Sequence, residues 1–211
     1  MPVLDLLGFA AGVSFAAGLN LYGTIAALGL LHRYGVFQLP SGLEALAHPV
    51  VIGAAIILYL VEFVADKIPY VDNVWDAVHT FIRPPAAAVL AWGAYAGVPA
   101  EWRLVAAMFG GSVALTAHST KSSARVAANT SPEPFSNWVL SLGEDLLALA
   151  IVGLAATHPV LTLLIVAVLL GICVFLLVKL VHALRWVFRR FFRRDGTSPP
   201  GQPAPGFPKE S

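Results

Sequence analysis

The stretch VLTLLIVAVLLGICVFLLV, residues 160–178, runs for 19 residues without a charge. A helix needs about 20 apolar residues to cross the roughly 30 Å hydrocarbon core of a membrane. The rest of the chain has a similar character, since 58% of its 211 residues are hydrophobic and only 12% are charged. An ordinary soluble domain has about 25% charged residues. The composition therefore excludes a soluble enzyme and predicts an integral membrane protein.

Working outward from this segment, we predict an all-α fold, a polytopic transmembrane helix bundle with six spans. The other five spans are expected at residues 6–31, 49–65, 86–98, 102–117 and 137–156. Segment 86–98 is short and rich in alanine and glycine, so whether it crosses fully stays open. Features follow a similar order in both halves of the chain. We take this as the hypothesis of an inverted 3+3 repeat, an arrangement found in many transporters.

Basic residues predict the orientation, because lysine and arginine collect on the cytoplasmic side of membrane proteins. With six spans, the basic residues favour both termini in the cytoplasm and a location in the cell membrane. Residues 1–194 are expected to form the transmembrane domain. Residues 195–211 contain five prolines and are expected to form a disordered, Pro-rich cytoplasmic tail.

Membrane lipids are the expected partners, and no nucleic acid is expected. A basic and aromatic cluster precedes the tail, and such clusters next to a membrane attract anionic lipid. The residues expected to contact anionic lipid are Arg189, Arg190, Arg193 and Arg194. The sequence leaves the oligomeric state open.

Polar residues within the spans converge on one depth. A helical rise of 1.5 Å per residue places Glu62, His118 and Glu144 about 10 Å below the cytoplasmic face. A cationic stripe that starts at His118 and an acidic pair that starts at Glu62 therefore meet. An unpaired charge inside a membrane costs at least roughly 2.5–3.5 kcal/mol, so we expect the two stripes to pair.

Two interpretations of the polar residues at this depth stay open. The residues either form the cytoplasmic end of helices held together by ion pairs, or line an inward-facing polar cavity that binds a substrate. The candidate substrate-binding residues are His118, Lys121, Ser122, Arg125, Asn20 and Tyr22. The candidates for charge balance or a proton relay are Glu62, Asp66, Glu144 and Asp145.

Residues 67–83 are predicted to form an amphipathic connector whose polar face carries Asp72, Asp76, His79 and Arg83. This face is interpreted as solvated or salt-bridged, or as a gating or cavity-lining element. A third interpretation is a divalent-metal site on Asp72, Asp76 and His79. The Asp-x3-Asp spacing resembles that of CDP-alcohol phosphotransferases, but their upstream Asp-Gly-x2-Ala-Arg element is absent. We predict no catalytic residue, no metal and no cofactor.

Three functions follow from these patterns. The first is a small transporter or lipid-translocating protein with a polar site open to the cytoplasm and a small anionic or lipid substrate. A proton-coupled cation is almost as consistent with the residues. The second is a non-catalytic membrane scaffold or interaction protein with structural ion pairs. The third is a membrane-embedded, metal-dependent transferase that uses the Asp-x3-Asp helix.

Several segments together resemble a bacterial membrane-protein family, domain-of-unknown-function family 4126. They are AGLNLY at 17–22, EFVADKIP at 62–69, WDAVHTFIRP at 75–84, HSTK at 118–121 and PEPFSN at 132–137. The resemblance covers roughly residues 10–155. It implies a small integral membrane protein of an uncharacterised family and supplies no activity or substrate.

Overall fold

The computed structural model describes residues 2–68, 70–129 and 134–192. These residues form helices and no strand, which confirms the all-α prediction. The chain forms two compact units, residues 1–177 and 178–211, and each is considered by itself. The predicted tail at 195–211, together with Arg193 and Arg194, lies outside the described residues.

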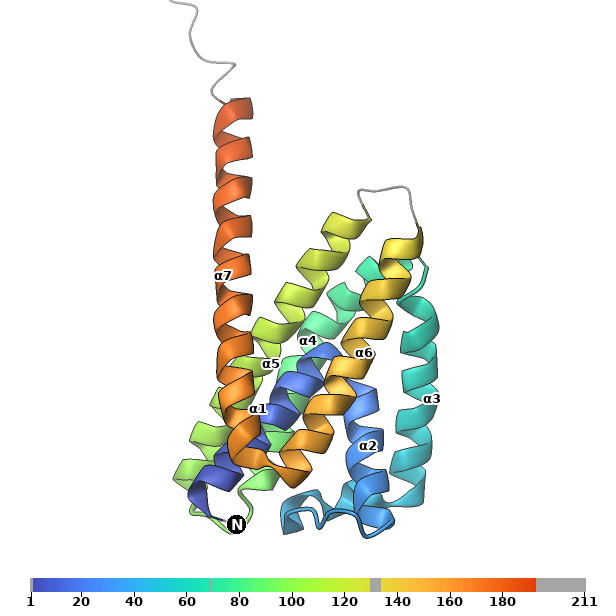
Figure 1. Cartoon of the computed structure of the whole chain (residues 1–211), viewed down its shortest axis with the longest axis vertical. Helices are drawn as coiled ribbons and strands as arrows, with labels where there is room; N and C mark the ends of the chain where they lie inside the picture. Colours follow the sequence, from blue (N-terminus) through green and yellow to red (C-terminus); the bar gives the residue numbers. More distant parts are fainter. Residues whose placement is uncertain (1, 69, 130–133, 193–211) are drawn as a thin grey trace, which may run out of the picture. The chain divides into compact units, whose positions relative to one another are not determined.

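The first predicted span is two helices that fold back on each other. Helix α1 (Val3–Leu19) and helix α2 (Leu21–Arg33) meet at Asn20. In Figure 1, α1 runs from the end marked N into the middle of the helices, and α2 returns toward the same end. The ring centroids of Phe9 in α1 and Phe37 just beyond α2 lie 5.4 Å apart. The pair is therefore a hairpin, and the prediction of one span over residues 6–31 is wrong.

This hairpin removes the basis of two further predictions. The prediction that both termini lie on one side depends on six spans, and the hairpin is not one of them. The 3+3 repeat is not confirmed either, because the first half opens with a hairpin and the second with the single helix α5 (Ala100–Ala128).

Helices long and apolar enough to cross a membrane are found in the C-terminal half of the described chain. They are Phe135–Thr157 in α6 (Pro134–Thr157) and Pro159–Arg190 in α7 (Pro159–Phe192). A third candidate is the 3-10 helix η1 (Ser41–Ala47) joined to α3 (Pro49–Ala65), the two bent by 69°. Two or three such helices support a membrane protein, while six spans are not confirmed.

The predicted amphipathic connector is wrong in its boundaries, because residues 71–94 form one helix, α4 (Val71–Ala94). Pro84 and Pro85 lie inside it. A proline lacks the N–H that a helix interior requires, but membrane proteins tolerate it where neighbouring helices hold the segment. Here α5 packs closely, since a Cβ on Gly111 would lie 3.2 Å from the carbonyl oxygen of Pro84.

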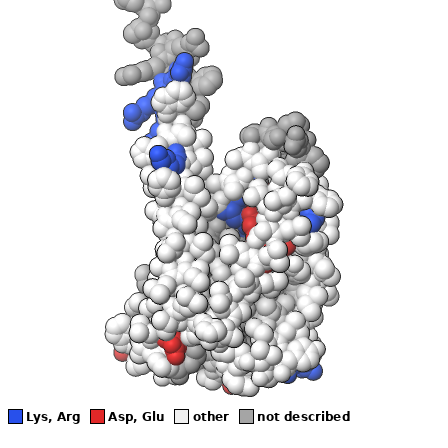
Figure 2. All heavy atoms as spheres, in the orientation of Figure 1, with Lys and Arg blue, Asp and Glu red and all other residues white. Residues whose placement is uncertain are grey.

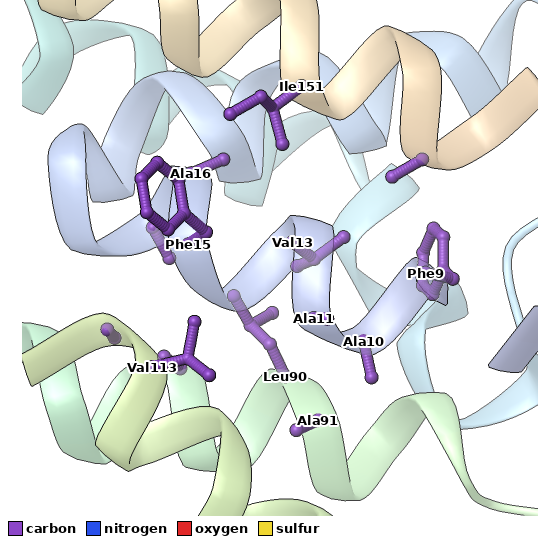
Figure 3. Close-up of a cluster of buried hydrophobic side chains, with 14 of the residues drawn as sticks. Phe9, Ala10, Ala11, Val13, Phe15, Ala16, Leu90, Ala91, Val113 and Ile151 are labelled. Carbon is purple, nitrogen blue, oxygen red and sulfur yellow. The ribbon is translucent and has the colours of Figure 1, made fainter. Parts of the chain in front are cut away.

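Helix α1 lies in the centre of residues 1–177. Its residues from Gly8 to Leu19 are all buried, which explains why the helix has no polar face. Figure 3 shows Phe15 and Val13 of α1 between Ile151 of α6 on one side and Leu90 of α4 and Val113 of α5 on the other. This apolar core fixes the position of the end of α1.

The outer surface is largely apolar, as expected of a protein that faces lipid. Many large hydrophobic side chains are exposed on α3, α5, α6 and α7. Figure 2 shows only small patches of charged atoms among uncharged ones on the face it presents.

The second unit is described over residues 178–192, the C-terminal part of α7. Its described basic residues are exposed, Arg189 and Arg190 among them, and the Arg190 guanidinium lies 5.3 Å from the Trp186 ring centroid. Contact with anionic lipid stays a prediction.

Close approach of α1 to α5 gives a test of this core. A Cβ on Gly18 would lie 2.6 Å from the carbonyl oxygen of Ala114, so Gly18→Ala must displace backbone. Overpacking of this kind costs about 1–3 kcal/mol, and we expect a lower melting temperature in detergent. Gly53→Ala in α3 is the matched control, because nothing lies within 4 Å of its added Cβ. Equal melting temperatures for the two variants would contradict the packing.

Candidate functional site

The site begins at Asn20, where α1 ends inside the protein. Asparagine is a preferred N-cap residue, and here its side-chain oxygen accepts a hydrogen bond of 2.7 Å from the N–H of Gly23 in the first turn of α2. Its side-chain nitrogen donates to Oδ1 of Asp145 on α6, also at 2.7 Å. Asn20 therefore ends one helix, begins the next and links both to α6.

Two cations meet the carbonyl groups at the end of α1. Nη1 of Arg83 on α4 donates to the carbonyl oxygens of Gly18 and Leu19, both at 2.9 Å. Nζ of Lys121 on α5 donates to Leu19 at 2.9 Å. The last carbonyls of a helix have no helical partner and carry partial negative charge, so cations stabilise this end.

These cations are paired with acidic side chains. Arg83 contacts Glu62 on α3 at 2.5 Å, and Lys121 contacts Asp66 at 3.1 Å. The side chains of these four residues are at most 1% exposed. A buried charge is retained only with a close opposite charge and good hydrogen bonds, and both are present.

Arg125, one turn beyond Lys121 on α5, extends the ion pairs to α6. Its Nη2 lies 2.8 Å from Asp66 and 2.5 Å from Glu144. Lys121 also lies 3.5 Å from Glu144. We call the set joined by these ion pairs the charged cluster; its members are Glu62, Asp66, Arg83, Lys121, Arg125 and Glu144.

His118 is neutral and fixed in one tautomer by its neighbours. A guanidinium can only donate, so Nδ1 of His118 accepts from Nη1 of Arg83 at 3.0 Å. A carbonyl can only accept, so Nε2 donates to the backbone oxygen of Asp76 at 3.0 Å. The hydroxyls of Thr80 and Ser122 lie 3.0 and 3.4 Å from the same Nε2.

His79 has the opposite tautomer preference. Its Nδ1 donates to the backbone oxygen of Trp75 at 2.8 Å, and its Nε2 lies 3.1 Å from the Tyr22 hydroxyl. The ring stacks on Trp75 with centroids 4.6 Å apart. Tyr22 is therefore positioned through His79, beside the charged cluster.

A further polar chain joins α4, α5 and α6. The Asn129 amide nitrogen donates to both carboxylate oxygens of Asp72 at 3.0 Å, and the Asn137 amide donates to Asn129. Asp72 is buried. These hydrogen bonds link the C-terminal end of α5 to the first turns of α4 and α6.

Lys67 follows α3 and is half-buried. Its Nζ donates to the backbone oxygen of Phe63 at 3.0 Å and to the hydroxyl of Ser141 at 3.3 Å. Burial lowers the pKa of the Lys67 ammonium, and the nearby carboxylates of Asp145 and Asp66 oppose that effect.

The structure thus brings together residues from both predicted stripes. The cationic stripe on α5 contacts the acidic pair that starts at Glu62. The polar face predicted for the connector is buried in the same region and does not face solvent. Ser122 lies at the edge and is half-buried. Asp145 contacts Asn20 and not the cations of the charged cluster.

Several residues that hydrogen-bond within this region are not among the site residues predicted from the sequence. They are Tyr59, Lys67, Ser141 and Asn137. Lys67 and Ser141 were within reach of sequence reasoning, because each lies near a helix end that carries a predicted acidic residue. Tyr59 gives no such signal within its apolar helix.

The described residues do not bring three or more histidine, cysteine, aspartate or glutamate side chains into a group that could hold a metal ion. Asp72 is engaged by Asn129 and His79 by Tyr22. The arrangement therefore gives the proposed Asp-x3-Asp metal site no support.

Comparison with known proteins agrees with the resemblance in the sequence. The family described as a domain of unknown function, DUF4126, matches residues 7–179. The chain belongs to this family, a family of unknown function whose member here has helices apolar enough to cross a membrane. No curated protein and no solved structure matches the chain.

The dual role of Asn20 can be separated by substitution. Asn20→Ala removes the cap, worth about 1 kcal/mol, and also removes the donor to Oδ1 of Asp145. Asn20→Ser keeps a capping oxygen and loses only the contact with Asp145. We expect the melting temperature to fall for both variants, and further for Asn20→Ala. Equal losses would show that the cap contributes nothing.

Lys121 provides a test of the ion pairs. Lys121→Met leaves Asp66 and Glu144 with Arg125 alone and leaves Arg83 as the remaining donor to the Leu19 carbonyl. Removal of one partner from a buried ion pair costs about 3–5 kcal/mol, so we expect a large fall in the melting temperature. Arg103→Met is the control, because its guanidinium lies at the far end of the helices, over Trp92. A fall no larger than that of the control would contradict the assigned pairing.

Proposed function

We propose that this protein is a multi-pass transporter of the cell membrane and that the charged cluster is the place through which a small polar solute passes. The observation that carries the proposal is the meeting of buried ion pairs with the end of α1. Charges inside a membrane protein are costly and commonly mark an ion or substrate path. Helix ends that lie inside the protein, with their carbonyls facing a polar site, are a recurrent feature of transporter binding sites.

Charge balance bears on the substrate class. Among the described residues, six carboxyl groups are buried or nearly so, namely Glu62, Asp66, Asp72, Asp76, Glu144 and Asp145. Three buried cations accompany them: Arg83, Lys121 and Arg125. Half-buried Lys67 makes four. The excess of carboxyl groups favours a cation or a proton-coupled solute over the anion first expected.

The enclosure of the charges favours a small solute over a lipid. A lipid-translocating protein needs a polar path along its lipid-facing surface, whereas the side chains of Arg83, Lys121 and Arg125 have no exposed area. We expect the end of the helices that carries the charged cluster to face the cytoplasm, because Lys67 lies at that end.

The same full burial favours the second candidate, a membrane scaffold in which the ion pairs are structural. The two functions differ in whether water ever reaches the charged cluster. In a transporter, the cluster opens to one side of the membrane during the cycle; in a scaffold, it stays closed.

Labelling of a buried serine distinguishes them. In a Cys173→Ser background, Ser141→Cys introduces a thiol at a fully buried position that contacts Lys67. We expect a membrane-impermeant maleimide to label it in vesicles, because the cluster opens. Ser14→Cys is the matched control, since Ser14 is equally buried but lies in the apolar core beside Gly110.

The expected result is labelling of Ser141→Cys from the cytoplasmic side, with Ser14→Cys protected. Protection of both variants under all solutes tested would overturn the transporter and favour the scaffold. Equal labelling of both would indicate unfolding, which the melting temperature of each variant detects.

A further inference from the structure

Asp76 differs from the other buried acids in this region. It lies on α4, is 2% exposed, and neither of its carboxylate oxygens has a hydrogen-bond partner among the residues that the structure describes. Asp72, one turn earlier on the same helix, accepts two hydrogen bonds from Asn129. Two aspartates on one face of α4 are therefore equally buried but unequally satisfied.

The cation nearest to Asp76 is already engaged. Nη2 of Arg83 lies 4.0 Å from Oδ1 of Asp76 but 2.5 Å from Oε1 of Glu62. Nη1 of the same guanidinium is held by the carbonyls of Gly18 and Leu19 and by His118. His118 itself donates to the backbone oxygen of Asp76 and leaves the carboxylate without a donor.

An ionised carboxylate buried without a hydrogen bond is highly unfavourable, and neutralisation by a proton relieves the cost. A metal cation is a poor alternative, because Na⁺-like and divalent ions need several oxygen ligands. The carbonyls of Gly18 and Leu19, which contact the same guanidinium, are occupied by Arg83 and Lys121. Of the small cations, a proton alone needs no further ligand.

We propose that Asp76 is a proton-binding carboxyl of this protein, and that its proton couples to movement of the α1–α2 hairpin. With the proton bound, Arg83 stays on Glu62 and on the end of α1, as observed. When the proton leaves toward water, Asp76 becomes an anion 4.0 Å from the guanidinium. Arg83 then shifts from Glu62 to Asp76 and releases the carbonyls of α1.

Through this exchange, Arg83 links the proton on Asp76 to the end of α1. The role in transport rests on the proposed function, whereas proton binding at Asp76 does not. Other titratable or charged groups surround Asp76 on the neighbouring elements. They are Tyr22 on α2; Glu62 on α3; Asp66 and Lys67 between α3 and α4; Asp72, His79 and Arg83 on α4; His118, Lys121 and Arg125 on α5; and Glu144 and Asp145 on α6.

Infrared difference spectroscopy tests the inference with the proton itself as the probe. The full chain, labelled with ¹³C-aspartate, is reconstituted in phosphatidylcholine–phosphatidylglycerol vesicles and moved between alkaline and acidic buffer. In Asp76→Asn, we expect the protonated-carboxyl band to be weaker than in the wild type by the contribution of one aspartate. Asp72→Asn, the matched control on the same helix face, is expected to keep that contribution.

A second variant covers the case in which Asp76→Asn does not fold. Asp76→Glu keeps a carboxyl at the position, so its band is expected to remain but to lose its isotope shift. An unchanged isotope-sensitive band in either Asp76 variant would overturn the inference, as would an equal loss in Asp72→Asn. Because this readout needs no transport, a positive result together with a protected Ser141→Cys would reject the transporter and keep the proton site.

Discussion

The end of α1 in the middle of the protein is the constraint from which the other polar contacts follow. The carbonyls of Gly18 and Leu19 need donors where no water is at hand, and Arg83 and Lys121 supply them. Two buried cations in turn require anions, which α3 and α6 provide. Arg125 then joins the anions of those two helices. The end of α1 inside the protein thus accounts for the charged residues on α3, α4, α5 and α6.

Much of this charged cluster could be predicted from the sequence, because its signals are local. The spacing of His118, Lys121 and Arg125 puts them on one stripe of any helix, whatever surrounds it. Depth within an apolar segment is likewise set by the helical rise. Both signals depend on neither loops nor tertiary packing, and the residues they indicated do lie together.

Two features of the fold could not be predicted in this way. An asparagine within an apolar segment is compatible with a continuous helix, and only the donors from α4 and α5 and the acceptor Asp145 on α6 show that the chain turns at Asn20. Pro84-Pro85 is a strong stop signal in water, yet α4 continues through it against the glycines of α5. In both cases, partners distant in sequence decide the local conformation. The orphaned carboxylate of Asp76 is visible only once those partners are placed.

The central position of α1 also bears on how the protein is made. Helix α1 is synthesised before the helices that cover it, because α4, α5 and α6 follow up to about 150 residues later along the chain. Until α6 is in place, the carboxylate of Asp145 is not there to receive Asn20, and one side of the hairpin has no neighbour. Helix α1 is therefore made well before its native neighbours, and it reaches its native surroundings only when the helices that follow it have been inserted.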